Sequence, residues 1–242
     1  MVVERRGQYT PEQQALSNLP RLVEQSVRDT QDLQRQLTGF KPGMDLINWH
    51  KRTDRYRYVY GETQRFKRDV RRSRDKTSLR HNLAGIVFQD IAYSVCALDC
   101  DDSRVLLSPE KTSEFWTMLY PNKEIVSHPY GQETLENAYV PDGILVNTSK
   151  AFNIYKRPVF KLYEYSLVHM TERDLEEQLK AIRIQHEKFP GLFAETSVEF
   201  VIPRTFPLPR LSSEEKKVEF LQLPITRVQF GHFITDLYNG MR

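Results

Sequence analysis

Two acidic residues stand in stretches of sequence that otherwise have the composition of buried β-strands. Asp142 follows a proline in the stretch from Val140 to Val146, and Glu164 lies in the middle of the apolar stretch from Val159 to Val168. A carboxylate inside a sheet is costly to desolvate unless it is paired, hydrogen-bonded or bound to a cation. Two carboxylates from neighbouring strands, with a backbone carbonyl and waters, can hold Mg²⁺, which can activate water and stabilise charge on a phosphodiester. Asp142 and Glu164 are therefore the first candidates for metal-dependent hydrolysis.

A second chemical feature is the strongly basic stretch between Lys51 and Arg80. Its thirty residues include twelve Lys or Arg and four Asp or Glu, a charge of +8, whereas the whole chain carries +3 and the remainder therefore −5. Such a surface attracts the phosphates of nucleic acid, and interleaved aromatic residues such as Tyr56 and Phe66 can stack on unpaired bases. The alternative is a solvated basic helix or hairpin whose tyrosines pack on the domain. The residues expected to contact nucleic acid are Arg55, Arg57, Arg65, Lys67, Arg68, Arg71, Arg72 and Arg74.

The first part of the chain is expected to form a helix that precedes the main domain. Thr10 and Pro11 suit a helix N-cap and the first helical position, and after Pro20 apolar residues recur with helical spacing from Val23 to Leu37. Because the opposite face is polar, this amphipathic helix can pack on the main body or on a partner subunit. We expect a helical and basic N-terminal region over residues 1–80 and an α/β domain over residues 81–242.

The elements that must position the two carboxylates are expected to form a mixed sheet. The succession of elements contains a strand-helix-strand crossover, which places strands in one sheet and gives an α/β (α+β) fold with a mixed central sheet flanked by helices. The predicted elements are a buried helix from Ser78 or Asn82 to about Leu98, a strand at 104–107, a helix at 111–119, strands at 140–146 and 159–168, a helix from a capping box at Thr171 to near Phe189, a strand at 198–202, a charged helical piece at 212–221 and an apolar segment at 228–237.

The acidic pair and its surroundings resemble a known family. Pro141-Asp142-Gly143-Ile-Leu-Val, followed by Tyr163-Glu164-Tyr165-Ser166-Leu167 and a helix, is similar to the PD-(D/E)xK nuclease superfamily over roughly Asn82 to Ile202. The resemblance implies a restriction-endonuclease-like core of order α-β-β-β-α-β. It also implies that Asp142 and Glu164 bind Mg²⁺ or Mn²⁺, with the Tyr165 carbonyl as a further ligand. Family members often add an acidic residue from the first core helix, where this chain has Gln89 followed by Asp90.

The lysine of the family signature falls at Ser166 in this sequence. Strand alternation places Glu164 and Ser166 on one face and Lys161 on the other, so Lys161 does not replace the missing lysine without a bulge. Lysines of this superfamily can migrate to another element, and Lys180 on the following helix is the preferred candidate, with Lys150 and Lys156 behind it. The resemblance thus implies a catalytic set of Asp142, Glu164 and Lys180, with Gln89, Asp90 and Ser166 as accessory candidates.

These features favour a metal-dependent nuclease-like protein that hydrolyses DNA phosphodiester bonds. The first alternative is a catalytically inactive nuclease-fold subunit that binds DNA within a restriction, recombination or mobile-element complex, and the second is a structural or interaction subunit. The sequence is compatible both with a homodimer and with a subunit of a larger complex.

Other function classes are disfavoured by what the sequence lacks. There is no apolar run near 18 residues and no leader-like N-terminus, so we expect no membrane span and a cytoplasmic protein. Cys96 and Cys100 are expected to be two reduced core thiols. The six histidines show no zinc-like spacing, and the phosphate-loop, dinucleotide and serine-hydrolase motifs do not occur.

Overall fold

The computed structural model describes most of the chain in separate ranges. The eight basic residues expected to contact nucleic acid, together with Lys150 and Lys156, lie outside the described residues. The described residues are 9–36, 46–51, 76–97, 100–101, 103–121, 125–128, 131–134, 140–148, 159–167, 171–193, 195–209 and 217–240.

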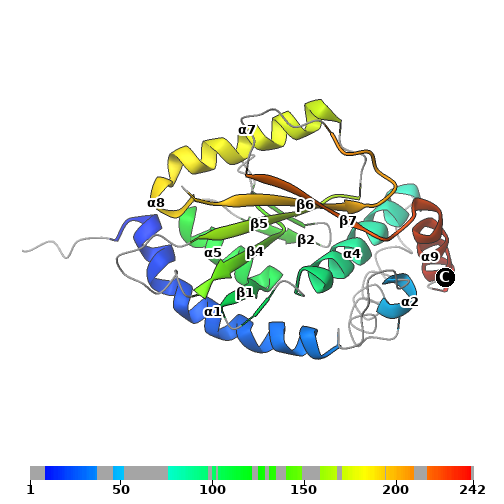
Figure 1. Cartoon of the computed structure of the whole chain (residues 1–242), viewed down its shortest axis with the longest axis horizontal. Helices are drawn as coiled ribbons and strands as arrows, with labels where there is room; N and C mark the ends of the chain where they lie inside the picture. The colour runs from blue at the N-terminus through cyan, green and yellow to red at the C-terminus, as the bar shows by residue number, and fades with distance from the viewer. Residues whose placement is uncertain are drawn as a thin grey trace, which may run out of the picture.

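A mixed five-stranded sheet forms the centre of the structure (Figure 1). The first two pairings across the sheet are antiparallel and the last two are parallel. The expected α/β class with a mixed central sheet is therefore confirmed. In order across the sheet, the strands are β1 (Arg104–Leu107), β4 (Gly143–Asn147), β5 (Phe160–Tyr165), β6 (Ser197–Pro203) and β7 (Val218–Leu223).

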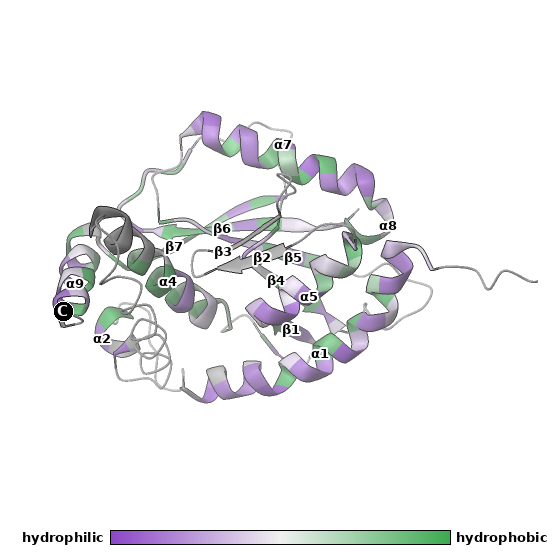
Figure 2. Cartoon of the chain, turned by 180° about the vertical axis from the view of Figure 1, so that it is seen from behind, coloured by the Kyte–Doolittle hydropathy of each residue, from purple (hydrophilic) through white to green (hydrophobic). Residues whose placement is uncertain are grey.

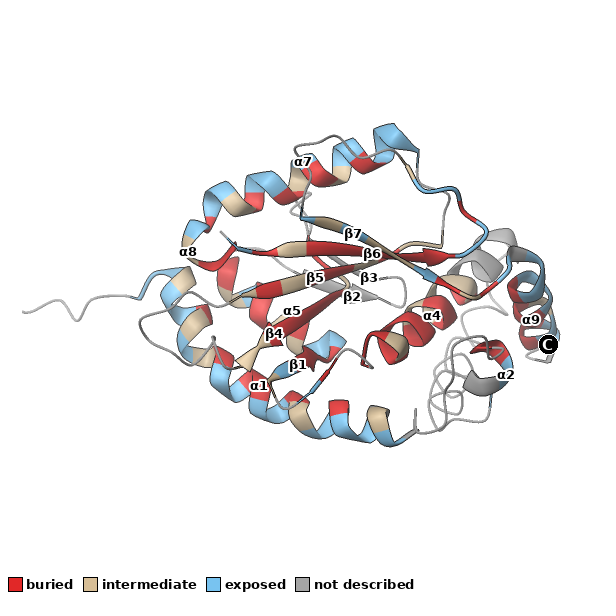
Figure 3. Ribbon diagram, viewed as in Figure 1, coloured by how far each residue is buried: buried red, intermediate tan, exposed pale blue. Residues whose placement is uncertain are grey.

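Helices cover both faces of this sheet, as alternating side chains of the strands require. Phe160 and Phe200 point into one core, which is covered by α1 (Pro11–Gln36), α5 (Pro109–Leu119), α7 (Glu172–Lys188) and α8 (Pro190–Phe193). Tyr163 and Val201 point into the other core, which is covered by α2 (Leu46–His50), α4 (Lys76–Cys96) and α9 (Arg227–Gly240). Figure 3 shows the buried sides of the helices turned toward the strands. A separate antiparallel hairpin consists of β2 (Ile125–His128) and β3 (Gly131–Thr134).

The N-terminal helix packs against the sheet that follows it. Leu19 and Leu22 of α1 are fully buried in the same core as the strands, and the Thr30 hydroxyl donates a hydrogen bond to the Leu106 carbonyl at 3.2 Å. Figure 2 shows the polar and apolar residues that alternate around α1. Since β1 is an edge strand, α1 covers an edge that would otherwise be open to pairing. The expected helix is confirmed, and it continues through Pro20, which lies on its exposed side.

Most other elements agree with the sequence, and one does not. The capping box of α7 is present, because the Thr171 hydroxyl accepts from the Asp174 backbone and the Asp174 side chain accepts in return. The prediction of a charged helix at 212–221 is wrong for the described residues of this segment, because Val218–Leu223 forms strand β7. The ring of Phe220 stacks on that of Phe200 in β6, with 5.5 Å between centroids, so pairing with a buried strand outweighs the helical propensity of the charged residues. The sequence patterns do not predict the hairpin β2–β3.

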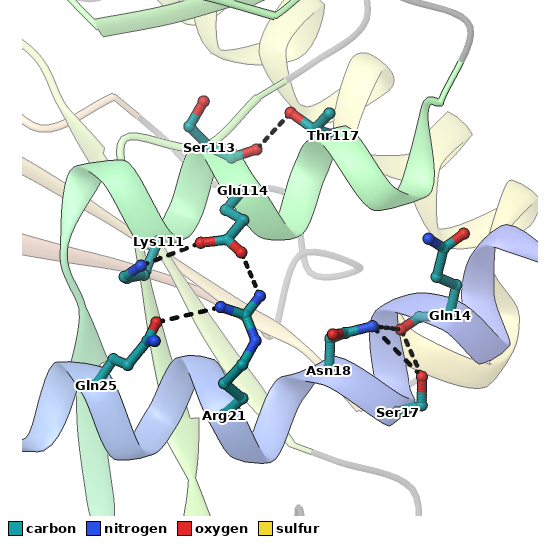
Figure 4. Close-up of polar contacts among 9 residues, drawn as sticks. All are labelled: Gln14, Ser17, Asn18, Arg21, Gln25, Lys111, Ser113, Glu114 and Thr117. Atoms are coloured by element: carbon teal, nitrogen blue, oxygen red, sulfur yellow. Dashed lines mark hydrogen bonds and ion pairs between the residues drawn. The ribbon is translucent and has the colours of Figure 1, made fainter.

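A charged cluster ties α1 to α5 (Figure 4). Arg21 of α1 forms an ion pair with Glu114 of α5, and the Lys111 Nζ lies 3.1 Å from the other oxygen of the same carboxylate. Hydrogen bonding from Arg21 lowers the pKa of Glu114 below its ordinary value of 4.5. The contact therefore fixes α1 on its neighbour most firmly when Glu114 is ionised.

We predict that Glu114→Gln lowers the free energy of unfolding at neutral pH by up to about 1 kcal/mol, because the pair is partly exposed. A carboxyl with a lowered folded-state pKa stabilises the protein above its unfolded pKa, and this stabilisation is lost as pH falls through the folded-state value. The difference between wild type and variant should therefore vanish in acid, which urea unfolding at several pH values measures. Glu177→Gln, which breaks the exposed Arg173 pair on α7, is the matched control and should change little. A deficit in Glu114→Gln that stayed constant into acid would contradict the prediction.

Candidate functional site

Asp142 lies at the point where β4 begins beside the end of β5. Its backbone N–H donates to the Tyr163 carbonyl at 3.0 Å, and its side-chain Oδ2 accepts the Tyr165 backbone N–H at 2.8 Å. A side-chain oxygen thus takes the place that a backbone carbonyl of the neighbouring strand would hold in a regular ladder. The hydrogen bond fixes the carboxylate at the end of the β4–β5 pair.

The helix α4 supplies a second donor to the same carboxylate. Gln89 is half-buried in the middle of α4, and its Nε2 lies 3.3 Å from Oδ1 of Asp142. The fold therefore brings together three of the residues singled out from the sequence, Asp142, Tyr165 and Gln89, from two strands and one helix. Asp90, the neighbour of Gln89, is buried, and its backbone carbonyl accepts from the Ser94 hydroxyl at 2.8 Å.

The environment of Asp142 disfavours a charged carboxylate. Although part of the residue reaches solvent, burial of the carboxyl raises its pKa to about 7, and the Tyr165 N–H opposes this rise only in part. In the described part of the chain, no cationic side chain is in contact with this carboxylate. Nor do the described residues contain a group of three or more His, Cys, Asp or Glu placed to hold a metal ion.

Glu164 approaches the same strand ends from the other face of the sheet. Alternation along β5 places its side chain with Phe160 and Leu162, whereas Tyr163 and Tyr165 face α4. The register pairs Gly143 with Tyr163, so Asp142 and Glu164 are the next residues along their two strands. The two side chains therefore extend toward different faces of the sheet, and the sharing of one cation by both stays a prediction.

The backbone carbonyl of Tyr165 lies on the side of β5 that faces β4 and Asp142. In an antiparallel ladder the N–H and C=O of one residue face the same neighbouring strand. Because the Tyr165 N–H meets Asp142, its carbonyl is turned to the same side. Ser166, which holds the signature position of the lysine, continues the ladder on the opposite side, where its N–H donates to the Val201 carbonyl at 3.0 Å.

The lysines considered from the sequence are placed differently. Lys180 is exposed on α7, and its catalytic role stays a prediction. Lys161 lies on the Tyr163 face, where its Nζ is 2.8 Å from Glu199 and 3.0 Å from Glu219. Burial alone would lower the pKa of Lys161, but the hydrogen bonds that it donates to these two glutamates raise this pKa above its ordinary value. Sequence reasoning missed this network, because the register of three strands had to be known to bring the charges together.

The residues that lead into the basic stretch pack on the α4 side of the sheet. Leu46 and Ile47 of α2 are buried in the core with α4 and α9, and the Lys51 Nζ lies 4.8 Å from the centroid of the Phe233 ring of α9. This contact has the geometry of a cation–π interaction. The nucleic-acid contacts expected from residues 55–74 stay a prediction.

Comparison with protein-family models, with curated proteins and with solved structures finds no match to the chain. Among the described helices, none is long and apolar enough to span a bilayer. Cys96 and Cys100 are both buried and form no disulfide bond, as expected.

Gly143 is required at the site because Tyr165 lies over it. A Cβ at position 143 would meet the Tyr165 hydroxyl oxygen at 2.7 Å but the ring carbon that bears it at 3.5 Å. The first distance is a clash, whereas the second is an ordinary contact. The buried Tyr165 hydroxyl has no hydrogen-bond partner in the described part of the chain, and burial raises the pKa of this phenol well above its ordinary value.

We predict that Gly143→Ala lowers the free energy of unfolding by about 1–3 kcal/mol, as overpacking does in a close-packed core. Tyr165→Phe should be neutral or stabilising, since it removes a buried hydroxyl without a partner. The double variant should regain most of the loss, which a double-mutant cycle in urea measures as a coupling of about 1 kcal/mol or more. Gly231→Ala, on the exposed side of α9 with nothing within 4 Å, is the control and should not destabilise. Additive effects of the two substitutions would contradict the prediction.

Proposed function

We propose that this chain is a nuclease-like protein that binds DNA and hydrolyses phosphodiester bonds with one divalent cation, Mg²⁺ or Mn²⁺, in the cytoplasm. The observation that carries the proposal is the enclosed Asp142 carboxylate at the end of β5, which meets two neutral donors and no described cation. Strongly perturbed carboxylates of this kind are concentrated at functional sites.

The residues at the strand ends are proposed to hold a single hard cation. Asp142 and Glu164 offer carboxylate oxygens, and the Tyr165 carbonyl faces the same position. Each oxygen of Asp142 accepts one described hydrogen bond and keeps capacity for a further partner. A cation bound there supplies Lewis-acid chemistry, because it activates water and offsets charge on the phosphodiester.

Neighbouring residues of the chain hold the Asp142 carboxylate in position. The Tyr165 N–H holds Asp142 at a fixed angle to β5, and Gln89 holds its second oxygen from the α4 side. The Tyr165 side chain packs closely over Gly143, the residue that follows Asp142. Lys180, or another lysine, is proposed to stabilise the charge that develops on the phosphate.

The order of elements also supports the proposal. From α4 onward the described elements run α4, β1, α5, β2, β3, β4, β5, α7, α8 and β6. Without α5, α8 and the separate hairpin β2–β3, the order is α4, β1, β4, β5, α7, β6. This is the α-β-β-β-α-β order implied by the resemblance to PD-(D/E)xK nucleases. Asp142 immediately precedes β4 and Glu164 lies on the adjacent antiparallel strand β5, which agrees with the arrangement that the resemblance implies.

One observation favours a second candidate function, a DNA-binding subunit on the same fold without catalysis. Gln89 contributes an amide where an additional acid would strengthen metal binding, and Ser166 stands at the signature position of the lysine. Such a protein would act as one component of a restriction, recombination or mobile-element complex, as a homodimer or with other chains.

We predict that the purified chain cuts plasmid or single-stranded DNA in the presence of Mg²⁺ or Mn²⁺, and that Asp142→Ala and Glu164→Ala each abolish cleavage. Removal of the cation with a chelator should have the same effect, because each change removes a ligand or the ion itself. Gel electrophoresis of the products provides the measurement, and Glu199→Gln is the matched control, since Glu199 is a buried acid on β6 that pairs with Lys161. Equal cleavage by all variants would exclude this site. DNA binding without cleavage under any divalent cation would select the second candidate.

The basic stretch is predicted to supply the DNA affinity. Replacing Arg71, Arg72 and Arg74 with Gln should weaken binding to any DNA sequence and reduce the slope of log affinity against log salt by about 0.9 for each phosphate that is no longer neutralised. Fluorescence anisotropy with a labelled duplex at several salt concentrations measures both quantities. The control replaces three exposed arginines elsewhere, Arg28, Arg35 and Arg173, and should leave the slope unchanged. An equal effect of both triple variants would show that only net charge matters.

A further inference from the structure

We propose that β7 is the contact surface of a homodimer, in which the β7 strands of two copies of this chain pair antiparallel about a two-fold axis. The central sheet of one copy then continues into the central sheet of the other. This inference goes beyond the proposed function and does not rest on it, because β7 is the edge strand of the sheet and Asp142 lies at the end of the β4–β5 pair.

The two edge strands of the sheet, β1 and β7, are covered differently. Helix α1 lies along β1, and its Thr30 hydroxyl donates to the Leu106 carbonyl of that strand at 3.2 Å. Among the described helices, none lies as close along β7. An edge strand without such a cover is a template for pairing with another strand, so β7 is the edge that can accept one.

The outer side of β7 presents backbone groups without partners. The Lys217 carbonyl accepts the Val198 N–H of β6 at 2.9 Å, which shows that the odd-numbered residues of β7 turn their N–H and C=O toward β6. Because this direction alternates along a strand, the N–H and C=O of the even-numbered residues face away from β6. These groups form no hydrogen bond in the described part of the chain. The residues concerned are Val218, Phe220 and Gln222.

The strand β7 lacks the features that keep a free edge from pairing. Such edges are usually blocked by proline, lysine or a bulge, whereas Val218–Leu223 contains neither residue and pairs with β6 in an unbroken register. Its one charged residue, Glu219, has a carboxylate oxygen 3.0 Å from the Lys161 Nζ. Phe220 and Leu221 are only partly buried. A further strand beside β7 therefore covers apolar surface and meets a charge that is already compensated.

The sequence of β7 is complementary to itself in one register. With the two-fold axis at Phe220, this residue lies opposite its own equivalent, and Val218 lies opposite Gln222 of the second copy. Outward-facing residues then meet outward-facing residues, and each pair exchanges both N–H···O bonds. Glu219 lies opposite Leu221 of the second copy, so no like charges are directly opposed. An axis at Glu219 would place two glutamates opposite each other, which is destabilising.

A second copy satisfies this edge without creating a new one. Pairing of β7 with itself is an isologous contact, which closes at a dimer because the same strand serves both copies. The outer strands of the joined sheet are then the two β1 strands, each covered by its own α1. An isolated strand from a different protein would leave its own outer side open. The arrangement of the sheet therefore favours a second copy of this chain as the partner.

Hydrogen exchange resolved by residue with NMR tests the pairing on the wild-type chain. On raising the protein concentration, the outward amides of Val218, Phe220 and Gln222 should exchange roughly tenfold more slowly, because they become paired in the dimer. The amides of Glu219 and Leu221, which face β6, are the internal control and should be protected at every concentration. Outward amides whose exchange does not depend on concentration overturn the proposal.

Sedimentation equilibrium of Val218→Pro provides an independent test. Proline at this position removes an N–H that faces away from β6, so the ladder within the chain is kept. The wild type should dimerise, and the variant should dimerise roughly tenfold more weakly, because each copy loses one backbone hydrogen bond of the interface. The control is Glu110→Pro, an exposed position in the first turn of α5, where proline is tolerated, and it should dimerise as the wild type does.

Two results of sedimentation would contradict the homodimer. A wild type that stays monomeric at all concentrations overturns the proposal, and so does a dimer whose affinity Val218→Pro leaves unchanged, because its interface then lies elsewhere. Should Val218→Pro not fold, the exchange of the outward amides in the wild type decides the question alone.

Discussion

The hydrogen bond from the Tyr165 N–H to the Asp142 carboxylate is the contact on which the site depends. It replaces one rung of the β4–β5 ladder with a side-chain oxygen, and so it holds an acid at the end of a sheet where a backbone carbonyl would otherwise lie. Such a replacement is possible because β4 begins at Gly143, immediately after Asp142. Gly143 in turn leaves room for the Tyr165 ring, which stacks on Tyr163 with 6.2 Å between centroids.

The position of α4 follows from the rest of the fold and is equally necessary. Gln89 reaches Asp142 only because α4 is held on the sheet by a core shared with α2 and α9. Just beyond the C-terminal end of α4, the Gln34 side chain of α1 donates to the Ala97 carbonyl at 3.3 Å and to the Cys100 carbonyl at 2.7 Å. The N-terminal helix, which packs along the edge strand β1, thus helps to fix a helix that contacts the site.

Much of this architecture can be predicted from the sequence, because its signals are local. The strand β1, the capping box at Thr171 and the period of α1 are set by neighbouring residues, and the structure contains all three. The strand β7 differs, because Glu214, Glu215 and Lys216 suggest a helix and only pairing with β6 turns Val218 and the residues after it into a strand. Likewise, the contact of Gln89 with Asp142 joins residues 53 positions apart, so its distance follows from packing and not from spacing.

The two acidic pairs of the sheet also explain why residue type alone does not identify a site. Glu199 stands in an apolar strand just as Glu164 does, yet Lys161 meets it across the strands, and a buried acid with such a partner is structural. Asp142 has no equivalent partner among the described residues, and burial holds the pKa of its carboxyl at about 7. The folded protein therefore keeps an acid whose ionised form it stabilises only in part, and protonation removes this cost. Neighbouring strands of one sheet thus hold two different acids: Glu199, which Lys161 neutralises, and Asp142, which meets only neutral donors among the described residues.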